Sequence, residues 1–228
     1  MIIFRQLFDP NTWTYTYVLA DPITRDAIII DPVLEQTERD LAVLAELQVN
    51  LRYILETHVH ADHITGGGKL RHNTGAKFVA GAGTKLDCAD VLMADGDVLA
   101  FGHETIRALS TPGHTDGCTS YVWRNCLFTG DTLLIDACGR TDFQQGNAKK
   151  LYASLQKLLA FPGETLVYPA HDYNGRHVSS VAQEKEINPY IAGLDADAFE
   201  QKMLALNLPH PRFIDVAVPG NLKCGDVE

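Results

Sequence analysis

Short apolar segments of this chain repeatedly end at a histidine or an aspartate. The segment Leu51 to Leu55 leads into His58, the segment Thr165 to Tyr168 leads into His171, and Asp131 follows a third such segment. Short apolar runs bounded by turn residues are typical of buried strands. In layered α/β proteins, functional groups gather where strands end. The pattern therefore predicts an α/β fold with one site built from several strand ends.

The remaining periodic segments predict an alternation of strands and helices. The segment Trp13 to Val18 alternates aromatic residues with threonine and valine, as a strand with two different faces does. Apolar residues at helical spacing predict helices over 34–44 and 151–159. Such alternation is typical of a layered α/β domain. Further strands are predicted over 27–30, 77–80, 98–109, 120–123 and 126–128, a helix start over 64–71, and a last helix around Phe199, Met203 and Leu206 with Asp195 as its N-cap.

Composition limits the class of protein and its partners. The chain has 228 residues, of which 46% are hydrophobic and 21% charged, so it can bury a core as one domain or a domain with a short appendage. A net charge of −10 disfavours binding to nucleic acid or to anionic membranes. Apolar runs stay well short of the roughly 18 residues of a membrane span. Arg5 and Asp9 interrupt the N-terminal apolar run, which argues against a signal peptide.

The five cysteines are scattered and include no CxxC pair. In a chain of this size, that spacing predicts reduced thiols in a reducing compartment rather than a disulfide framework.

The densest group of chemically active residues follows the segment Leu51 to Leu55. His58, His60, Asp62 and His63 place three imidazoles and a carboxylate within six residues. If the strand continues, His58 and His60 point to the same side, and a turn after them brings in the other two. Imidazole nitrogen with carboxylate oxygen suits zinc, iron or manganese. A polar loop of solvated histidines is the plainer alternative, but four candidate ligands in six residues argue against it.

Three further segments supply the same chemistry from distant parts of the chain. His114 lies in a Pro-Gly turn after a strand, while Asp131 and His171 each follow a strand. Taken alone, each of these is an ordinary turn residue. Together with the histidine group, they predict one metal site at the strand ends.

These motifs, HxHxDH, PGHT, TGD and PAHD in this order, resemble the metallo-β-lactamase superfamily. The resemblance covers nearly the whole chain. It implies a four-layer αββα sandwich, in which two mixed sheets are flanked by helices and the metals lie at one edge between the sheets. It also implies a single domain over 1–228, with 190–228 as a short C-terminal extension packed on it.

Within the superfamily, the segment Cys138 to Gly146 resembles the persulfide dioxygenases, also called sulfur dioxygenases. The segment Tyr168 to Tyr173 and the C-terminal motifs Asn207-Leu-Pro-His-Pro, Ala217-Val-Pro-Gly-Asn and Cys224-Gly do so as well. The resemblance implies oxidation of glutathione persulfide by O₂ and water to sulfite and glutathione. It further implies one non-haem Fe(II) per chain.

Carried over residue by residue, the iron ligands are His58, His114 and Asp131. Two histidines and one carboxylate leave coordination positions for substrate sulfur, O₂ and water. The other four residues of the set would hydrogen-bond the ligands and fix their orientation; they are His60, Asp62, His63 and His171. The spacing alone supports two zinc ions equally well.

The resemblance also implies contacts to glutathione. Arg140 and Tyr173 match family positions that bind it, and Arg212 is a further candidate for a carboxylate of the substrate. The structural alternative for Arg140 is an ion pair with Asp142 or Asp172.

Two other functions remain open at this point. A glyoxalase II-type zinc hydrolase of glutathione thioesters would use the same seven residues around two metals. The segment Cys138 to Gly146 and the short tail of about 57 residues after His171 disfavour it. A non-enzymatic metal or redox sensor would use the same site to report iron or persulfide to a partner, with the five cysteines as its redox elements. The resemblance implies a homodimer. The lack of a recognisable transit peptide favours a bacterial cytoplasm as the location, with the mitochondrial matrix as the eukaryotic equivalent.

Overall fold

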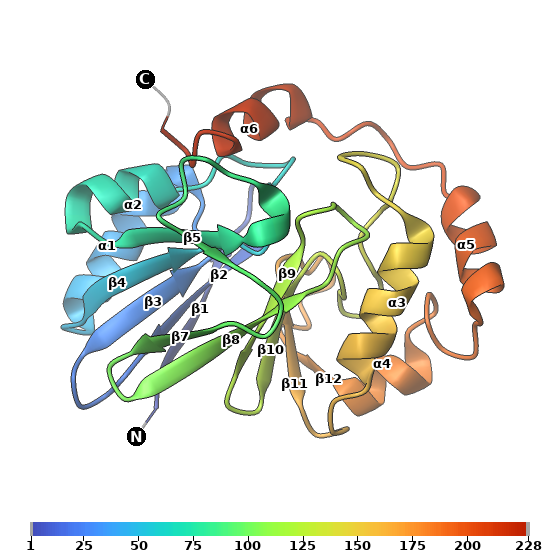
Figure 1. Ribbon diagram of the computed structural model, residues 1–228, viewed down its shortest axis with the longest axis horizontal. Helices are drawn as coiled ribbons and strands as arrows, with labels where there is room; N and C mark the ends of the chain where they lie inside the picture. Colours follow the sequence, from blue (N-terminus) through green and yellow to red (C-terminus); the bar gives the residue numbers. More distant parts are fainter. Residues whose placement is uncertain (1, 227–228) are drawn as a thin grey trace.

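Two mixed β-sheets face each other, and helices cover their outer sides (Figure 1). The computed structural model describes residues 2–226, so Met1 and residues 227–228 of the predicted domain lie outside the described residues. The first sheet is antiparallel at its start and parallel from its third strand onward. Its strands, in spatial order, are β1 (Ile3–Asp9), β2 (Thr14–Ala20), β3 (Asp26–Ile30), β4 (Asn50–Leu55), β5 (Lys77–Gly81) and β6 (Val91–Met93).

The second sheet is mostly antiparallel, with one parallel pair between β10 and β11. Its strands lie in the spatial order β12, β11, β10, β9, β8, β7. Their bounds are β7 (Val98–Phe101), β8 (Glu104–Ser110), β9 (Thr119–Trp123), β10 (Cys126–Gly130), β11 (Leu166–Pro169) and β12 (Ser179–Ser180).

The helices complete the four layers. Helices α1 and α2 cover the first sheet, and α3 and α4 lie against the second with α5 packed on the outer side of α3, while α6 lies near the C-terminus beyond α2 and β5 (Figure 1). The predicted four-layer αββα sandwich of the α/β class is confirmed. Over residues 2–226, every helix is too short or too polar to cross a bilayer. The helices are α1 (Thr37–Glu46), α2 (Gly67–Thr74), α3 (Ala148–Leu159), α4 (Val181–Ile187), α5 (Ala196–Leu204) and α6 (Ile214–Asn221), with 3₁₀ turns η1 (Leu34–Gln36) and η2 (Ala82–Thr84).

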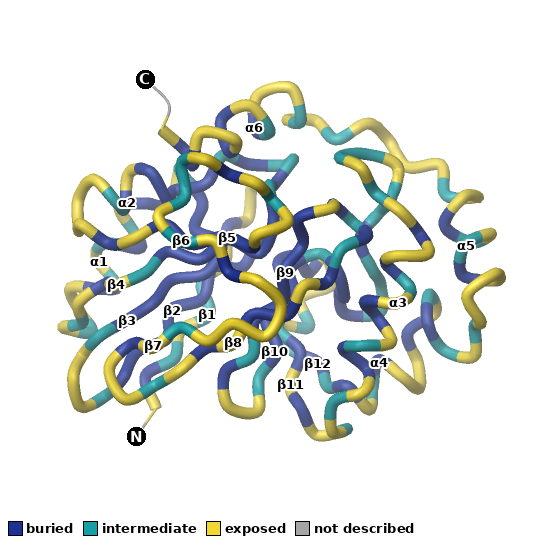
Figure 2. Tube along the Cα trace, viewed as in Figure 1, coloured by how far each residue is buried: buried dark blue, intermediate teal, exposed yellow. Residues whose placement is uncertain are grey.

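Three hydrophobic clusters fill the three spaces between these layers. Strand β2 shows how the sequence builds them: Tyr15 and Tyr17 face the second sheet, whereas Val18 faces the helices of the first. Every residue of β2 is buried, because both faces of its sheet are covered (Figure 2). Burial of each large apolar side chain contributes roughly 1.5–3 kcal/mol. The third cluster joins α3, α4 and α5 to the second sheet and includes Leu151, Leu155, Leu158, Val167 and Phe199.

The predicted strand over 98–109 is wrong in its length, because this segment forms the β7–β8 hairpin. Gly102 adopts a φ of +65° at the reversal, and the backbone N–H of His103 donates to the Asp21 carboxylate at 2.6 Å. A Gly-His pair between two apolar runs is a weak turn signal. The partner that stabilises the turn lies about eighty residues earlier in the sequence.

The helix predicted to begin within 64–71 starts at Gly67, and the helix predicted as the last one is followed by α6. Asp195 is confirmed as the N-cap of α5, since its carboxylate accepts a hydrogen bond from the backbone N–H of Ala198 at 2.8 Å. The prediction missed α6 because a proline and a glycine occur within it.

The prediction of five reduced thiols is wrong for one pair. Cys88 and Cys224 form a disulfide across a sequence separation of 136 residues. Cysteines so far apart produce no recognisable spacing, and only the folded C-terminal segment brings them together. Cys118, Cys126 and Cys138 are free thiols, as predicted.

Candidate metal centre

The histidine group lies in an irregular loop over 56–66, so the strand does not continue to His58 and His60. The backbone N–H of Glu56, just beyond β4, still donates to the Val79 carbonyl of β5 at 3.0 Å, and the chain leaves the sheet at the next residue. The backbone N–H of Thr57 donates to the Asp31 carboxylate at 2.8 Å instead of to a neighbouring strand. At Thr57, a hydrogen bond to a side chain thus takes the place of the hydrogen bond to a neighbouring strand. The chain then continues as a loop at the edge between the two sheets.

The structure brings His58, His114 and Asp131 together from three separate segments. One ligand atom from each lies within 4.8 Å of the others. Both imidazoles turn Nε2 toward the same carboxylate oxygen, Asp131 Oδ2, at 4.0 Å from His58 and 3.6 Å from His114. Their side chains are largely buried. The predicted metal ligands therefore form a group with two nitrogens and one oxygen around a common point.

Hydrogen bonds on the far side of each ring determine which nitrogen is free. His114 Nδ1 lies 2.7 Å from the carbonyl oxygen of Arg140, which can only accept, so Nδ1 carries the proton. His58 Nδ1 lies 2.9 Å from the hydroxyl of Thr57, which already donates to Asp31. That hydroxyl therefore accepts from His58. In both rings Nε2 keeps its lone pair for a metal.

His171 approaches the other oxygen of Asp131. Its Nε2 lies 3.7 Å from Asp131 Oδ1 and 3.5 Å from Asp62 Oδ2, while Nδ1 faces the carbonyl of Trp13 at 3.3 Å. Burial alone would lower the pKa of His171, but the charges of Asp131 and Asp62 raise it above its ordinary value. His171 thus lies beside the three-residue group, on the side of Asp131 Oδ1.

His60 and His63 are held by carboxylates. His60 Nε2 lies 3.2 Å from Asp31 and 3.4 Å from Glu56, and His63 Nδ1 lies 3.0 Å from Asp62. Burial would lower the pKa of His60, but the charge of Asp31 raises it well above its ordinary value. Burial also raises the pKa of Glu56 to about 7. Sequence reasoning missed Asp31 and Glu56 as partners, although both stand at strand ends like the predicted residues.

The group formed by His58, His114 and Asp131 fits a transition metal. Asp131 Oδ1 is buried and has no hydrogen-bond partner within the described part of the chain. Burial first, and then the neighbouring imidazoles of His60 and His114, hold the pKa of His58 well below its ordinary value, which favours the neutral ring that binds metals. Two imidazoles with one carboxylate and open positions are the donor set of non-haem Fe(II) oxygenases.

A cavity of about 410 Å³ opens above this group. The segment 209–213 forms one wall, and Trp13 and Tyr173 form part of another. Tyr173 stacks on His171, with ring centroids 6.0 Å apart. Trp13 was predicted inside a strand, but it precedes β2 with a φ of +60°, which turns it toward the cavity. Alternating patterns do not reveal where a strand begins, so this residue was missed as part of the site.

The three predicted substrate residues all line the cavity, but the two arginines differ in whether their charge is already paired. Arg140 binds both oxygens of Asp142 at 2.6 Å and donates to the carbonyl of Pro209 at 2.8 Å, so the ion pair with Asp142 is present. Arg212 is exposed, packs over the ring of Phe213 at 5.0 Å and has no ion pair among residues 2–226. An uncommitted guanidinium is therefore available at the cavity wall.

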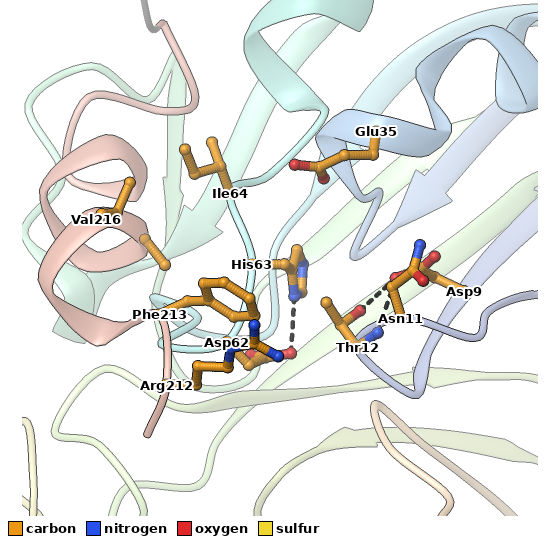
Figure 3. A pocket seen from close by; sticks show the side chains of 11 residues that line it. Asp9, Asn11, Thr12, Glu35, Asp62, His63, Ile64, Arg212, Phe213 and Val216 are labelled. Atoms are coloured by element: carbon orange, nitrogen blue, oxygen red, sulfur yellow. Dashed lines mark hydrogen bonds and ion pairs between the residues drawn. The ribbon is translucent and has the colours of Figure 1, made fainter. Parts of the chain in front are cut away.

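A second cavity of about 400 Å³, shown in Figure 3, shares part of its lining with the first. Asp62, Arg212 and Phe213 line both cavities, and His63 and Glu35 line the second. Arg212 therefore stands at the junction of the two spaces, on the side where the histidine loop faces the start of α6.

Comparison with known proteins agrees with this geometry. The family model of the metallo-beta-lactamase superfamily matches residues 14–171. The proteins named persulfide dioxygenase ETHE1, mitochondrial, from Mus musculus and Homo sapiens are each 46% identical over 228 residues, covering 98% of this chain and 89% of those proteins. The crystal structure of ETHE1 from Myxococcus xanthus is 52% identical, with a TM-score of 0.96 over 98% of this chain and 99% of that one. The predicted resemblance is confirmed: the chain belongs to the metallo-beta-lactamase superfamily and, within it, to the family of the ETHE1 persulfide dioxygenases.

Proposed function

We propose that this protein is a persulfide dioxygenase that oxidises glutathione persulfide at one Fe(II) per chain. The reaction consumes one persulfide, one O₂ and one water, and it yields glutathione, sulfite and two protons. The observation that carries the proposal is the shared orientation of His58 and His114 toward Asp131, with both free Nε2 atoms on the same carboxylate oxygen.

The side chains of this protein would hold, orient and shield the reactants. Fe(II) held by His58, His114 and Asp131 would supply adjacent open positions for the persulfide sulfur and O₂, together with the electron transfer between them. The Nδ1 contacts of His58 and His114 keep both rings in the tautomer that binds a metal. We assign His60, Asp62, His63 and His171 to holding this group in place, through the contacts between these imidazoles and the neighbouring carboxylates.

Binding of the glutathione moiety is assigned to Arg212, Arg140 and Tyr173. Arg212 offers an uncommitted guanidinium that matches a substrate carboxylate. Arg140 shares its charge with Asp142 and also holds the carbonyl of Pro209. We therefore assign two roles to Arg140: it holds segment 209–213 in place as a cavity wall, and it contacts the substrate. Tyr173 presents a ring and a hydroxyl at the cavity.

One observation favours the hydrolase alternative. Ligand atoms of His60, Asp62 and His63 also lie within 4.8 Å of one another, so a second metal could be bound there. A glyoxalase II-type hydrolase would then use two zinc ions and a bridging hydroxide.

O₂ uptake by the iron-loaded protein on glutathione persulfide separates the two functions. We expect one O₂ consumed for each sulfite released, and the zinc-loaded protein should be inactive in the same assay. Hydrolysis of a glutathione thioester by the zinc-loaded form, with no O₂ uptake by the iron form, would replace the proposal with the hydrolase.

Arg212→Ala is expected to raise the KM for glutathione persulfide about 10–100-fold, because a charge-assisted hydrogen bond contributes roughly 1.5–3 kcal/mol. Iron content should stay unchanged, since Arg212 contacts none of the three assigned ligands. Arg52→Ala, which removes an exposed arginine of β4, controls for the change in net charge. A KM like that of the unmodified protein would exclude Arg212 from substrate binding.

The proposal also includes a homodimer and a location in a bacterial cytoplasm, with the mitochondrial matrix as the eukaryotic equivalent. Sedimentation of the purified protein would test the first, and fractionation of the source cell would test the second.

A further inference from the structure

The C-terminal motif Ala217-Val-Pro-Gly-Asn has no role in the proposed chemistry. Its last residue, however, contacts the loop over 56–66, which is called the metal loop below. Asn221 ends α6, which lies close to the loop over 56–66 that carries the histidine group (Figure 1). It is only 3% exposed. A buried amide needs several hydrogen bonds to offset its desolvation.

All the bonds of this amide go to the backbone of the metal loop. Asn221 Nδ2 donates one hydrogen to the carbonyl of His60 at 2.9 Å and the other to the carbonyl of His63 at 2.8 Å. Asn221 Oδ1 accepts from the backbone N–H of Thr65 at 2.8 Å. One side chain thereby ties three peptide groups that lie on both sides of Asp62.

The loop depends on such bonds because it has no regular helix or strand of its own. Its buried backbone groups must find partners in other segments or in side chains, and the Thr57 carbonyl, for example, accepts from the backbone N–H of Thr119 at 2.8 Å. We propose that Asn221 is a positioning residue for the metal centre, holding the loop that carries His58 and Asp62 in the conformation that binds the metal. The inference rests on the proposed function only in that the loop takes part in holding a metal.

Other contacts dock the C-terminal turn independently of this amide. Cys224 is linked to Cys88 by the disulfide, and Arg71 pairs with Asp226 at 2.6 Å. Gly225 has a φ of +76°, and a Cβ added there would lie 2.4 Å from the carbonyl oxygen of Thr65, so turn and loop are in close contact. Loss of the Asn221 amide should therefore loosen the loop without releasing the turn.

Asn221→Asp tests the proposal, because it keeps the size and the acceptor but places an oxygen against two carbonyl oxygens. Metal retention is measured on the iron-loaded full chain without thiol reductant, as the rate of iron release to a chelator. We expect release 10–100-fold faster, the range found when groups that orient metal ligands are lost. The Co(II)-substituted protein should also show a changed visible spectrum, which a loss of stability alone would not cause.

Asn188→Asp is the matched control. Asn188 is also fully buried, and its amide donates to Ala137 and Glu184 outside the metal loop. It should lower thermal stability, as Asn221→Asp does, while iron release and the Co(II) spectrum remain those of the unmodified protein. If Asn221→Asp does not fold, Asn221→Ser, which retains one donor and one acceptor, should show a smaller increase in iron release.

Unchanged iron release and an unchanged Co(II) spectrum in a folded Asn221 variant would overturn the inference, as would equal changes in the Asn188 control. These readouts need no persulfide. If the Asn221 variant releases iron faster as expected, but the unmodified protein oxidises no persulfide, only the proposed function is contradicted. A protein that binds neither iron nor cobalt would contradict both.

Discussion

His114→Ala is expected to lose iron and persulfide oxidation together, with turnover falling by more than about 100-fold, the upper range for groups that merely orient ligands. Among residues 2–226, the ring of His114 contributes one of the two Nε2 atoms directed at Asp131 Oδ2, at 3.6 Å. Its loss leaves two of the three assigned ligands, and its Nδ1 contact to the Arg140 carbonyl disappears as well. Iron per chain by elemental analysis, measured beside O₂ uptake, checks the prediction.

His72→Ala provides the control, since His72 is exposed on α2, away from the cavity. It should keep full iron content and activity. A His114→Ala protein with full iron occupancy would show that His114 is not a ligand, whatever its activity.

The residues of the candidate site were predictable because each lies in a chemically distinctive motif. Three histidines and an aspartate within six residues are rare in any chain, and His114, Asp131 and His171 each follow a segment with a strand pattern. The same patterns predicted the layers, since alternating and apolar runs report which faces of a strand are covered. The gathering of strand ends at one edge followed from the α/β class.

The residues that hold the site were not predictable in this way. Asp31, Glu56 and Asn221 act through contacts to a loop, and two of these contacts join segments far apart in the sequence. A lone aspartate after a strand, or an asparagine before a C-terminal Cys-Gly turn, has no spacing that distinguishes it from an ordinary turn residue. The Cys88–Cys224 disulfide escaped prediction for the same reason.

Gly113→Ala is expected to destabilise the protein by about 4 kcal/mol or more and to weaken metal binding through its neighbour His114. Gly113 has a φ of +139°, where a side chain is strained, and a Cβ there would lie 2.2 Å from the backbone nitrogen of Leu151. The turn cannot move away easily, because the backbone N–H of Asn147 donates to the Gly113 carbonyl at 2.8 Å. The start of α3 and the turn that carries His114 are thus packed backbone against backbone.

Gly75→Ala separates backbone strain from steric overlap in this experiment. Gly75 also has a positive φ, +73°, but a Cβ there would meet nothing within 4 Å. Its alanine variant should lose only about 1 kcal/mol, the strain of the left-handed backbone. Chemical denaturation of both variants, with iron content measured on the folded protein, compares the two costs. Equal destabilisation of the two variants would mean that the turn before His114 can shift to accommodate a methyl group. Close packing of this turn on α3 would then not be what positions His114.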